Sequence, residues 1–367
     1  MLATLLLYEW FADLPTWLLL LIAVIAIAAL IKGADWLVEN AAAGAYRLGL
    51  SKVIIGATIV SLGTTSPEMA VSVMAAWSGN AGLALGNGVG SIIVDTGLIF
   101  GIGCLITQLP ADRFVLSRQG WVQIGSAALL AVICYAVFFI QGDAAVLGRW
   151  VGVLMTALLV AYMVISVRWS RQHPFGEPGM RADDEGETLP GVTHETVEVE
   201  TPAPLLVLLG WGLLGLAIVV FASDTLVGSA TVLAERAAVP QVVIAATLVA
   251  FGTSLPEFVV GMTSIRKGHA ELLVGNVIGA DILNVLFVIG FAALAAPLPI
   301  VEAEGVVGRH IFLWLHLPTM LLMLVFVRLC IVRAGRRGAF SRWMGAPLVI
   351  AYLAYVAIQF AATAGTG

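Results

Sequence analysis

Charged side chains are scarce in this 367-residue sequence. Asp, Glu, Lys and Arg together make up 11% of the residues, whereas hydrophobic residues make up 60%. Soluble globular domains carry about 25% charged and about 45–50% apolar residues. So few charges cannot cover a water-exposed surface of this size, which excludes a cytosolic enzyme. The formal net charge of −5 also lacks the basic excess of nucleic-acid-binding proteins, so no nucleic-acid partner is predicted.

Cysteine is scarce as well. The three cysteines, Cys104, Cys134 and Cys330, lie in or beside apolar runs, and the sequence has no CxxC motif. Neither a disulfide framework nor a zinc site is therefore predicted, and no cofactor is expected.

Long apolar segments are abundant instead. A helix that crosses a bilayer needs ~20 mostly apolar residues. Ten segments meet this requirement, namely residues 15–45, 53–76, 82–107, 120–141, 147–168, 204–235, 242–265, 271–296, 309–329 and 343–363. The sequence therefore predicts an all-α polytopic membrane protein of ten transmembrane helices, with five in residues 1–168 and five in residues 204–367.

The one long polar stretch, residues 169–203, joins these two halves. It contains eight acidic residues together with Pro and Gly, and this composition is typical of a flexible linker. A solvated tether and a segment that binds regulatory cations are both compatible with it.

The basic residues orient the chain in the membrane. Of the 18 Lys and Arg residues, 14 fall in the connections after spans 1, 3, 5, 7 and 9. By the positive-inside rule these connections, including the acidic linker, face the cytoplasm and both termini lie outside. We expect a multi-pass protein of the plasma (inner) membrane, and the sequence predicts no particular oligomeric state.

An internal repeat relates the two halves without a gap. Residues 53–101 align with residues 242–290 at a constant offset of 189, and 18 of the 49 aligned positions are identical. Because each half has five spans, an odd number, the two repeats are expected to have opposite orientations in the membrane. Inverted repeats are typical of secondary transporters, whose binding site lies near the midplane where the repeats meet.

The first repeated motif reads Gly-Thr-Thr-Ser-Pro-Glu at residues 63–68 and Gly-Thr-Ser-Leu-Pro-Glu at residues 252–257. Proline has no N–H for the carbonyl four residues earlier, so each span is expected to break near its middle. Free carbonyls, hydroxyls and a carboxylate form an all-oxygen set that suits hard cations such as Ca2+ and Na+. A packing hinge is the structural alternative. It does not explain Glu68 and Glu257, because a charged carboxylate in a bilayer costs about 2.5–3.5 kcal/mol.

A second repeated motif, Gly-Asn-x-x-Gly, follows on the next span of each half. Its small residues are predicted to allow close helix packing. Ser91 and Asp95 share one helix face, and Asp281 and Asn284 are neighbours on another, so the two acids are candidate ion ligands or proton carriers. Two further acids lie nearer the span ends, where capping or an interfacial position is expected: Asp35 and Asp224.

With these motifs the chain resembles the cation/Ca2+ exchanger superfamily and, within it, the sodium/calcium exchanger family. The family's two signature regions, called α-repeats, carry GTSxPE followed by a GNxxGSN-type segment, which are matched here in residues 53–101 and 242–290. The resemblance implies a fold in which spans 2, 3, 7 and 8 surround the ions while spans 1 and 6 slide past them. The implied function is antiport of Ca2+ against Na+, with K+ in some members, or against H+ in another branch.

The same resemblance assigns roles to individual positions. The central Ca2+ ligands would be Glu68 and Glu257, completed by the carbonyls of Thr64 and Thr253. The residues that would line Na+ sites are Thr65, Ser254 and Ser91, with the carbonyls of Ser61 and Ala250. The middle site would be formed by Asp95 and Asn284, and Asp281 is an additional candidate.

The sequence departs from the family pattern in the second motif. Ala280 stands where the family has Ser, which removes one hydroxyl from a possible Na+ site. Ile92 and Asp281 replace the family's Asn, and the middle pair, Asp95 and Asn284, reverses the Asn and Asp of well-known relatives. These changes keep H+-coupled or K+-assisted exchange of a divalent cation open as the alternative.

The mechanism that these features predict is alternating access, in which the two glutamates bind Ca2+ or Na+ ions but not both. An intramembrane enzyme is a rival of another class, but the sequence has neither a GxGD motif nor a DxxxD pair. A channel would also use acidic residues, and counter-transport would argue against it.

Overall fold

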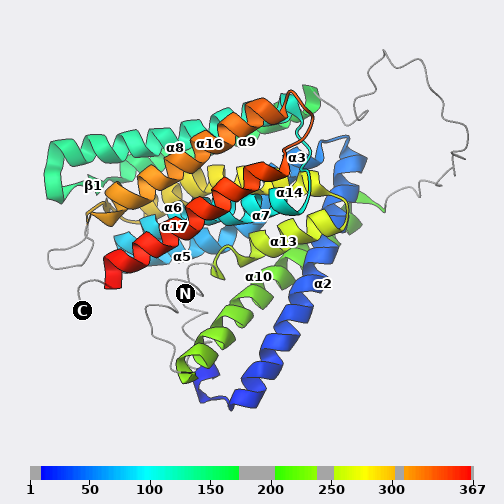
Figure 1. Cartoon of the computed structure of the whole chain (residues 1–367), viewed down its shortest axis with the longest axis horizontal. Helices are drawn as coiled ribbons and strands as arrows, with labels where there is room; N and C mark the ends of the chain where they lie inside the picture. The colour runs from blue at the N-terminus through cyan, green and yellow to red at the C-terminus, as the bar shows by residue number, and fades with distance from the viewer. Residues whose placement is uncertain (1–9, 173–202, 238–251, 302–309, 365–367) are drawn as a thin grey trace, which may run out of the picture.

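The computed structural model describes residues 10–172, 203–237, 252–301 and 310–364, which form a bundle of helices (Figure 1). In these residues eight helices are long and apolar enough to cross a membrane, or nine if a bent pair counts as one span. The prediction of an all-helical, multi-pass membrane protein is therefore confirmed. The expected span 242–265 lies partly outside the described residues, and its second part forms a helix from Leu255 to Arg266.

The elements of the first half follow the expected order. They are α2 (Thr16–Leu48), α3 (Lys52–Ile55), η1 (Gly56–Val60), α4 (Ser61–Thr64), α5 (Ser66–Trp77), α6 (Ala81–Val94), η2 (Asp95–Phe100), α7 (Gly101–Ile106), α8 (Arg113–Gln141), η3 (Gly142–Ala144) and α9 (Arg149–Gln172). Here η1 and η2 are π-helical turns and η3 is a short 3-10 turn. The linker 169–203 lies almost wholly outside the described residues.

The elements of the second half follow a corresponding order. Its elements are α10 (Leu205–Arg236), α13 (Leu255–Arg266), α14 (Ala270–Leu283), η5 (Asn284–Ile289), α15 (Gly290–Ala295), η6 (Phe312–His316), α16 (Leu317–Ala334), η7 (Arg342–Met344) and α17 (Gly345–Ala364). The π-helical turns here are η5 and η6.

Two short strands were not predicted. Strand β1 (Val146–Leu147) pairs antiparallel with β2 (Leu298–Pro299), so the connection between α8 and α9 is joined to the segment after α15. Two-residue strands leave no alternating pattern in a sequence, since hydrophobic alternation needs about four residues or more to be read.

Helix α8 begins earlier than the sequence predicted, at Arg113 instead of residue 120. The Asp112 carboxylate accepts hydrogen bonds from the backbone N–H groups of Phe114 (2.8 Å) and Val115 (3.2 Å), which caps the helix. The polar first turns carry no hydropathy signal, so only this cap marks the start.

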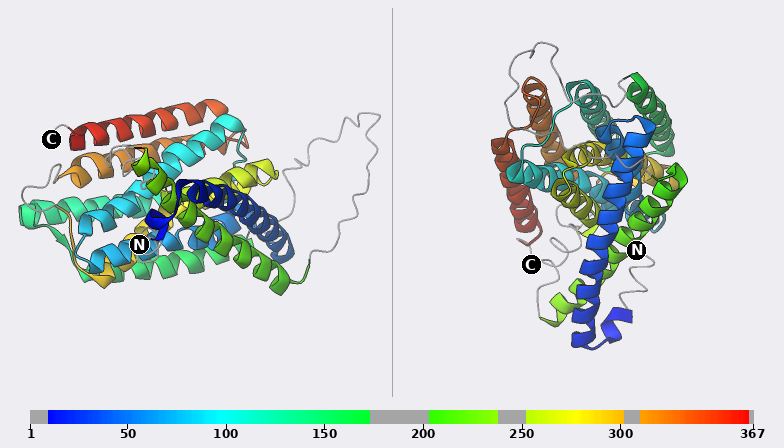
Figure 2. Two further views of the ribbon diagram at one scale, coloured as in Figure 1. Left: turned by 90° about the horizontal axis from the view of Figure 1, so that it is seen from below. Right: turned by 90° about the vertical axis from the view of Figure 1, so that its right-hand side faces the viewer.

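Helices α2 and α10 pack side by side and project from the rest of the bundle (Figures 1 and 2). They approach closely where Gly33 faces Gly215, because a Cβ atom on Gly215 would lie 2.7 Å from the Gly33 carbonyl oxygen. Helix α14 has the opposite environment. In the span Ala270–Ala295, 89% of the most apolar segment is buried, against 22% for α10. The second Gly-Asn motif therefore lies at the centre of the bundle.

Candidate cation-binding site

Both repeated proline motifs stand at the start of a helix. The first span bends by 43° between the segments Lys52–Thr64 and Ser66–Trp77, as the sequence predicted. Helices α5 and α13 each carry a proline at the beginning and a glutamate in the first turn, Glu68 and Glu257. A helix N-terminus exposes N–H groups and favours negative charge. Each carboxylate therefore lies where a helix N-terminus favours negative charge, and no Lys, Arg or His of the described residues forms an ion pair with it.

The two glutamates are deeply buried and short of partners. Each is 1% exposed. Neither carboxylate oxygen of Glu68 has a hydrogen-bond partner among the described residues, while Oε1 of Glu257 accepts from the Thr65 hydroxyl at 3.3 Å and its Oε2 has none. Glu68 repels the charges of Glu257 and Asp95. The three carboxylates thus form one local concentration of negative charge that a cation would relieve.

The predicted middle-site pair occupies equivalent places in the two halves. Asp95 begins the π-helical turn η2 and Asn284 begins η5, and both residues are 1% exposed. Both carboxylate oxygens of Asp95 and the amide oxygen of Asn284 lack partners among the described residues. Asp95 also repels the charge of Glu257. π-Helical turns inside α-helices are frequent at functional sites, and here the same irregularity is built twice.

The predicted hydroxyl ligands differ in their partners. Ser91 and Ser254 are buried with unpartnered hydroxyls, whereas Thr65 already bonds Glu257. The carbonyl of Ser61 accepts from the Thr65 N–H (2.8 Å) and the Thr64 hydroxyl (3.3 Å). In this conformation the Ser61 carbonyl is therefore occupied by hydrogen bonds from residues at the helix break.

The structure describes one of the two predicted carbonyl ligands of the second half. Thr253 is half-buried in the turn before α13, and Ala250 lies outside the described residues.

Two asparagines that received no role from the sequence contact this region. The Asn87 amide donates to the Glu68 carbonyl oxygen (3.1 Å) and to the Ser72 hydroxyl (3.0 Å). Its repeat equivalent, Asn276, accepts from the Thr64 hydroxyl at 3.4 Å through its side-chain oxygen. The Asn of Gly-Asn-x-x-Gly thus ties the second motif of each half to a first motif. The presence of this Asn in both copies of the motif was the sequence signal that could have identified it.

Asp281 lies in a separate polar contact. Its Oδ2 accepts from the Thr96 hydroxyl and from the Gln123 amide, each at 2.6 Å, and its Oδ1 has no partner among the described residues. Neither Thr96 nor Gln123 was a candidate, because each lies on a span remote in sequence from Asp281. Asp281 and Asp95 repel each other, so this contact adjoins the middle site.

The glycines of the second motif are unequal. A Cβ atom on Gly275 would lie 2.1 Å from the Val53 carbonyl oxygen, and one on Gly279 would lie 2.5 Å from Ala57. Close packing is thus confirmed for the second half. At Gly86 and Gly90 a Cβ would meet no described atom within 4 Å, but residues 242 and 246, the repeat equivalents of Val53 and Ala57, lie outside the described residues, so close packing in the first half stays a prediction.

Asp35, for which capping or an interfacial position is expected, lies on α2 beside the basic residues at the end of α13. It forms ion pairs with Arg266 and, at 3.5 Å, with Lys267, and Lys267 also pairs with Glu39 at 2.5 Å. These contacts connect α2 to the end of α13. They join the projecting helix pair to the part of the bundle that holds Glu257.

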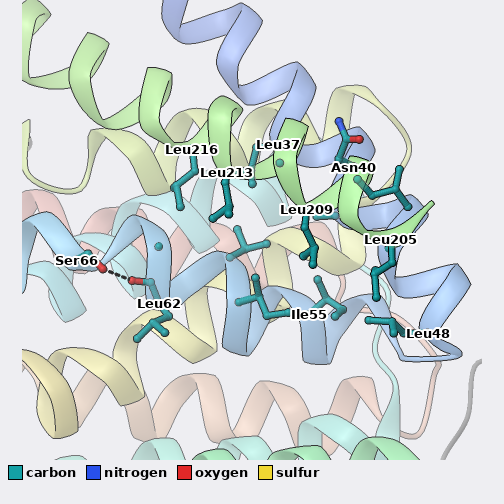
Figure 3. A pocket seen from close by; sticks show the side chains of 17 residues that line it. Leu37, Asn40, Leu48, Ile55, Leu62, Ser66, Leu205, Leu209, Leu213 and Leu216 are labelled. Atoms are coloured by element: carbon teal, nitrogen blue, oxygen red, sulfur yellow. Dashed lines mark hydrogen bonds between the residues drawn. The ribbon is translucent and has the colours of Figure 1, made fainter. Parts of the chain in front are cut away.

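A cavity of about 300 Å³ lies between α2, α10 and the first broken span (Figure 3). It reaches Gly63 and Ser66 in the first motif. Its lining is apolar except for Asn40 and Ser66, and the Ser66 hydroxyl bonds the Leu62 carbonyl at 2.6 Å. Such a lining offers few cation ligands. The cavity is space between the helix pair and the rest of the bundle.

No three Asp, Glu, His or Cys side chains of the described residues converge closely enough to hold a metal ion by themselves. A cation in this region would therefore be held by one or two carboxylates together with carbonyl, hydroxyl and amide oxygens. Such a set suits Ca2+, which takes 6–8 oxygen ligands, and excludes the sulfur-rich sites of soft metals.

Buried carboxylates at broken, repeated spans are features of membrane transporters, and comparison with known proteins places the chain among them. The model of the family "Sodium/calcium exchanger protein" matches residues 18–168 and 207–361. The chain belongs to the sodium/calcium exchanger family, a family of transporters and not of enzymes. The resemblance noted from the motifs is thereby confirmed.

Individual relatives cover nearly the whole chain. It is 29% identical over 366 residues to the sodium/calcium exchanger MaX1 of Methanosarcina acetivorans, covering 93% of this chain and 98% of that protein. It is 29% identical over 340 residues to the inner membrane protein YrbG of Escherichia coli, covering 92% and 95%. The solved structure of the sodium-calcium exchanger NCX_Mj has the same fold, with a TM-score of 0.72 at 24% identity over 94% of this chain and 99% of that one.

Proposed function

We propose that the protein exchanges Ca2+ for Na+ across the membrane by alternating access. The observation that carries this proposal is the pair Glu68 and Glu257, each buried at a helix start, one in each repeat, with three of their four carboxylate oxygens unpartnered among the described residues. Buried carboxylates without basic partners are costly. A transported cation that neutralises them explains why both halves retain one.

Competition for the same carboxylates makes transport an exchange. Glu68, Glu257 and Asp95 repel one another when no cation is present. An empty site therefore carries buried charge and resists movement through the membrane, whereas a site loaded with Ca2+ or with Na+ ions does not. After Ca2+ has left on one side, the site can return only with Na+ bound, and the reverse holds after Na+ has left. This requirement couples the two fluxes.

We propose further ligands beside Glu68 and Glu257. Thr64 and Thr253 would complete the Ca2+ site through their carbonyls. The candidates for Na+ and the middle site are Thr65, Ser254, Ser91, Ser61, Ala250, Asp95 and Asn284. The unpartnered hydroxyls of Ser91 and Ser254 and the unpartnered oxygens of Asp95 and Asn284 support this set.

The moving parts would be α2 and α10 against the helices that carry the site. These two helices pack on each other, and the cavity of Figure 3 lies between them and the first broken span, which they still contact where Leu216 of α10 meets Gly63. The name of MaX1 as a sodium/calcium exchanger supports the same function. Coupling to H+ or K+ is the second candidate, because Ala280 removes a hydroxyl and Asp281 adds a buried acid.

Flux into proteoliposomes tests the proposal. Purified protein is reconstituted in Na+-loaded vesicles, and uptake of radiolabelled Ca2+ is compared between an outward Na+ gradient and a pH gradient, each with the other clamped. We expect Na+-driven uptake. Glu68→Gln and Glu257→Gln each remove a ligand charge worth about 2–5 kcal/mol, so uptake falls by about thirtyfold or more. Asp143→Asn, a change at an exposed acid, is the control. Uptake that survives both glutamine substitutions contradicts the site.

We also propose a plasma-membrane orientation with both termini outside, the linker 169–203 in the cytoplasm, and residues 1–168 and 204–367 as the two five-helix repeats. The native cysteines are free and buried, so single cysteines can report on topology. In intact cells Asp143→Cys should react with an impermeant maleimide, whereas Arg336→Cys should react only after permeabilisation. The reverse pattern contradicts the orientation.

A further inference from the structure

The cavity between α2, α10 and the first broken span opens toward the lipid. Two of its lining residues, Ile59 on the first broken span and Leu213 on α10, are 50% and 61% exposed. Both belong to segments that are long and apolar enough to cross a membrane. The bilayer core around such segments holds acyl chains and no water. Acyl chains are therefore the molecules that reach the opening of the cavity.

The lining of the cavity does not suit water. Among its described lining residues only Asn40 and Ser66 have polar side chains, and these two lie apart (Figure 3). Each already donates a hydrogen bond to a backbone carbonyl four residues earlier, Asn40 to Trp36 at 2.7 Å and Ser66 to Leu62 at 2.6 Å. A buried water typically makes about three hydrogen bonds to polar groups. An apolar occupant fits this lining better.

The depth of the cavity matches one leaflet of a bilayer. Helix α10 lines it from Leu205 to Leu216, a rise of ~16 Å at ~1.5 Å per residue. This depth is about half of the ~30 Å hydrocarbon thickness. One end lies where α2 ends at Leu48 and α10 begins at Leu205, and the other reaches Ser66 at the helix break (Figure 3). The cavity thus runs from the membrane surface to mid-membrane, as one phospholipid acyl chain does.

A cationic side chain stands at the surface end of the cavity. Arg47 is exposed in the last turn of α2, next to Leu48. Its guanidinium donates to the Ala203 carbonyl at 2.7 Å, and Ala203 comes just before Leu205. The guanidinium therefore reaches from the end of α2 to the start of α10. Its planar fork of N–H groups is suited to phosphate, so a lipid tail in the cavity would place the lipid phosphate beside Arg47.

We propose that one acyl chain of a phospholipid occupies this cavity, with the lipid phosphate bound by Arg47. The chain fills the space between the α2–α10 pair and the first broken span, and it stabilises the position of the pair that this structure shows. The binding site itself does not depend on the proposed exchange function. If α2 and α10 move in that function, the chain has to shift with each cycle, so the bound lipid opposes the movement.

A photoreactive phospholipid tests the site in a membrane. The protein is reconstituted in vesicles of phosphatidylethanolamine and phosphatidylglycerol, in which some of the phosphatidylglycerol carries a diazirine near the end of one acyl chain. After irradiation, mass spectrometry identifies the labelled peptides. For the unaltered protein, we expect the strongest labelling in residues 59–66 and 213–216, at the deep end of the cavity. Labelling spread evenly over α8, α9 and α17 as well would overturn the site.

Gly44→Leu places a side chain in the cavity. Gly44 lines the cavity, and a Cβ atom there would meet no described atom within 4 Å. Gly210 on α10 has equally open surroundings but is not a lining residue, so Gly210→Leu is the matched control. Labelling of the two segments should be largely lost in Gly44→Leu and kept in Gly210→Leu. Equal labelling of the two variants contradicts the proposal.

Thermal unfolding in detergent provides a second readout. Added phosphatidylglycerol should raise the melting temperature of the unaltered protein and of Gly210→Leu, but hardly that of Gly44→Leu. Arg47→Gln should require about fivefold more lipid for the same rise, the usual effect of one basic residue on anionic lipid. Without lipid, Gly44→Leu should melt no lower than the unaltered protein. A lower melting temperature of Gly44→Leu, or an equal lipid effect in all four proteins, overturns the site. Neither readout involves transport, so failure of the exchange function would leave both unchanged.

Discussion

The hydroxyl of Thr65 lies 3.3 Å from Oε1 of Glu257, so the first repeat motif donates a hydrogen bond to the carboxylate of the second. The mirrored contact is absent from the described residues. Ser254, the repeat equivalent of Thr65, has an unpartnered hydroxyl, and Glu68 has two unpartnered oxygens. Two halves that match in sequence are thus unequal in this conformation. An alternating-access cycle would exchange the two environments.

Thr65→Val should destabilise the cation-free protein more than the Ca2+-loaded one. In the cation-free protein the variant leaves Oε1 of Glu257 buried without a donor, at a cost of about 1–3 kcal/mol. A bound Ca2+ ion would supply that oxygen with a partner again. The melting-temperature rise caused by Ca2+ should therefore be larger in the variant. Thr156→Val, which removes an unpartnered hydroxyl on α9 outside the proposed ligands, is the matched control, and an equal rise in all three proteins contradicts the proposed ligand role of Glu257.

Gly275→Ala should lower the stability by about 1–3 kcal/mol, the usual cost of overpacking. Its Cβ atom would lie 2.1 Å from the backbone carbonyl oxygen of Val53, which cannot rotate away as a side chain can. Helix α14 would have to move from the first broken span. Thermal unfolding in detergent measures the effect. Gly125→Ala, at an exposed helical position with no atom within 4 Å, should not lower the melting temperature, and equal losses would contradict the packing argument.

Much of this architecture could be predicted from the sequence, because a bilayer imposes strong local rules. Span length, the break before Pro67 and the burial of Glu68 and Glu257 all follow from hydropathy, from the missing proline N–H and from the repeat. Their roles as ion ligands stay predictions.

Long-range contacts could not be predicted in the same way. The donors to Asp281 come from Thr96 and Gln123, 185 and 158 residues away in the chain. The π-helical turn at Asp95 leaves no mark in hydropathy, and the ion pair of Asp35 with Arg266 depends on how α2 crosses α13. A single sequence allows each helix to be predicted from its composition, but it does not allow the angle between two packed helices to be predicted.

Asp35→Asn should change the rate of exchange more than the stability. The carboxylate joins α2 to Arg266 and Lys267 at the end of α13. If α2 slides along the bundle, these contacts must break in each cycle. Because the side chains of Arg266 and Asp35 are 57% and 20% exposed, the pair is worth at most about 1 kcal/mol, and the rate should rise by about fivefold or less.

Added salt should reproduce part of this acceleration in the unaltered protein, since salt screens exposed charges. Arg266→Gln combined with Asp35→Asn should give little further increase. A slower variant, or additive effects of the two substitutions, would show that the ion pair does not restrain the movement.

The melting temperature should decrease as the pH is lowered, because His269 then takes up a proton. Its Nδ1 lies 3.0 Å from the Lys52 ammonium, which only donates, so the ring accepts this bond in its neutral form. Burial, together with the charge of Lys52, lowers the pKa of His269 below 6.5. Between that lowered pKa and about 6.5, the unfolded chain binds more protons than the folded one, so stability rises with pH across this window and is lost as pH falls through it.

The glutamine variant separates His269 from other titrating groups. His269→Gln keeps a side-chain oxygen that can accept from Lys52 but cannot take up a proton near neutrality. Melting curves of both proteins are recorded between about pH 5 and pH 8. The unaltered protein should lose more stability toward pH 5 than the variant does, and the difference should vanish above about pH 7, because both accept the Lys52 bond there. Parallel curves over the whole range would mean that protonation of His269 does not break its contact with Lys52.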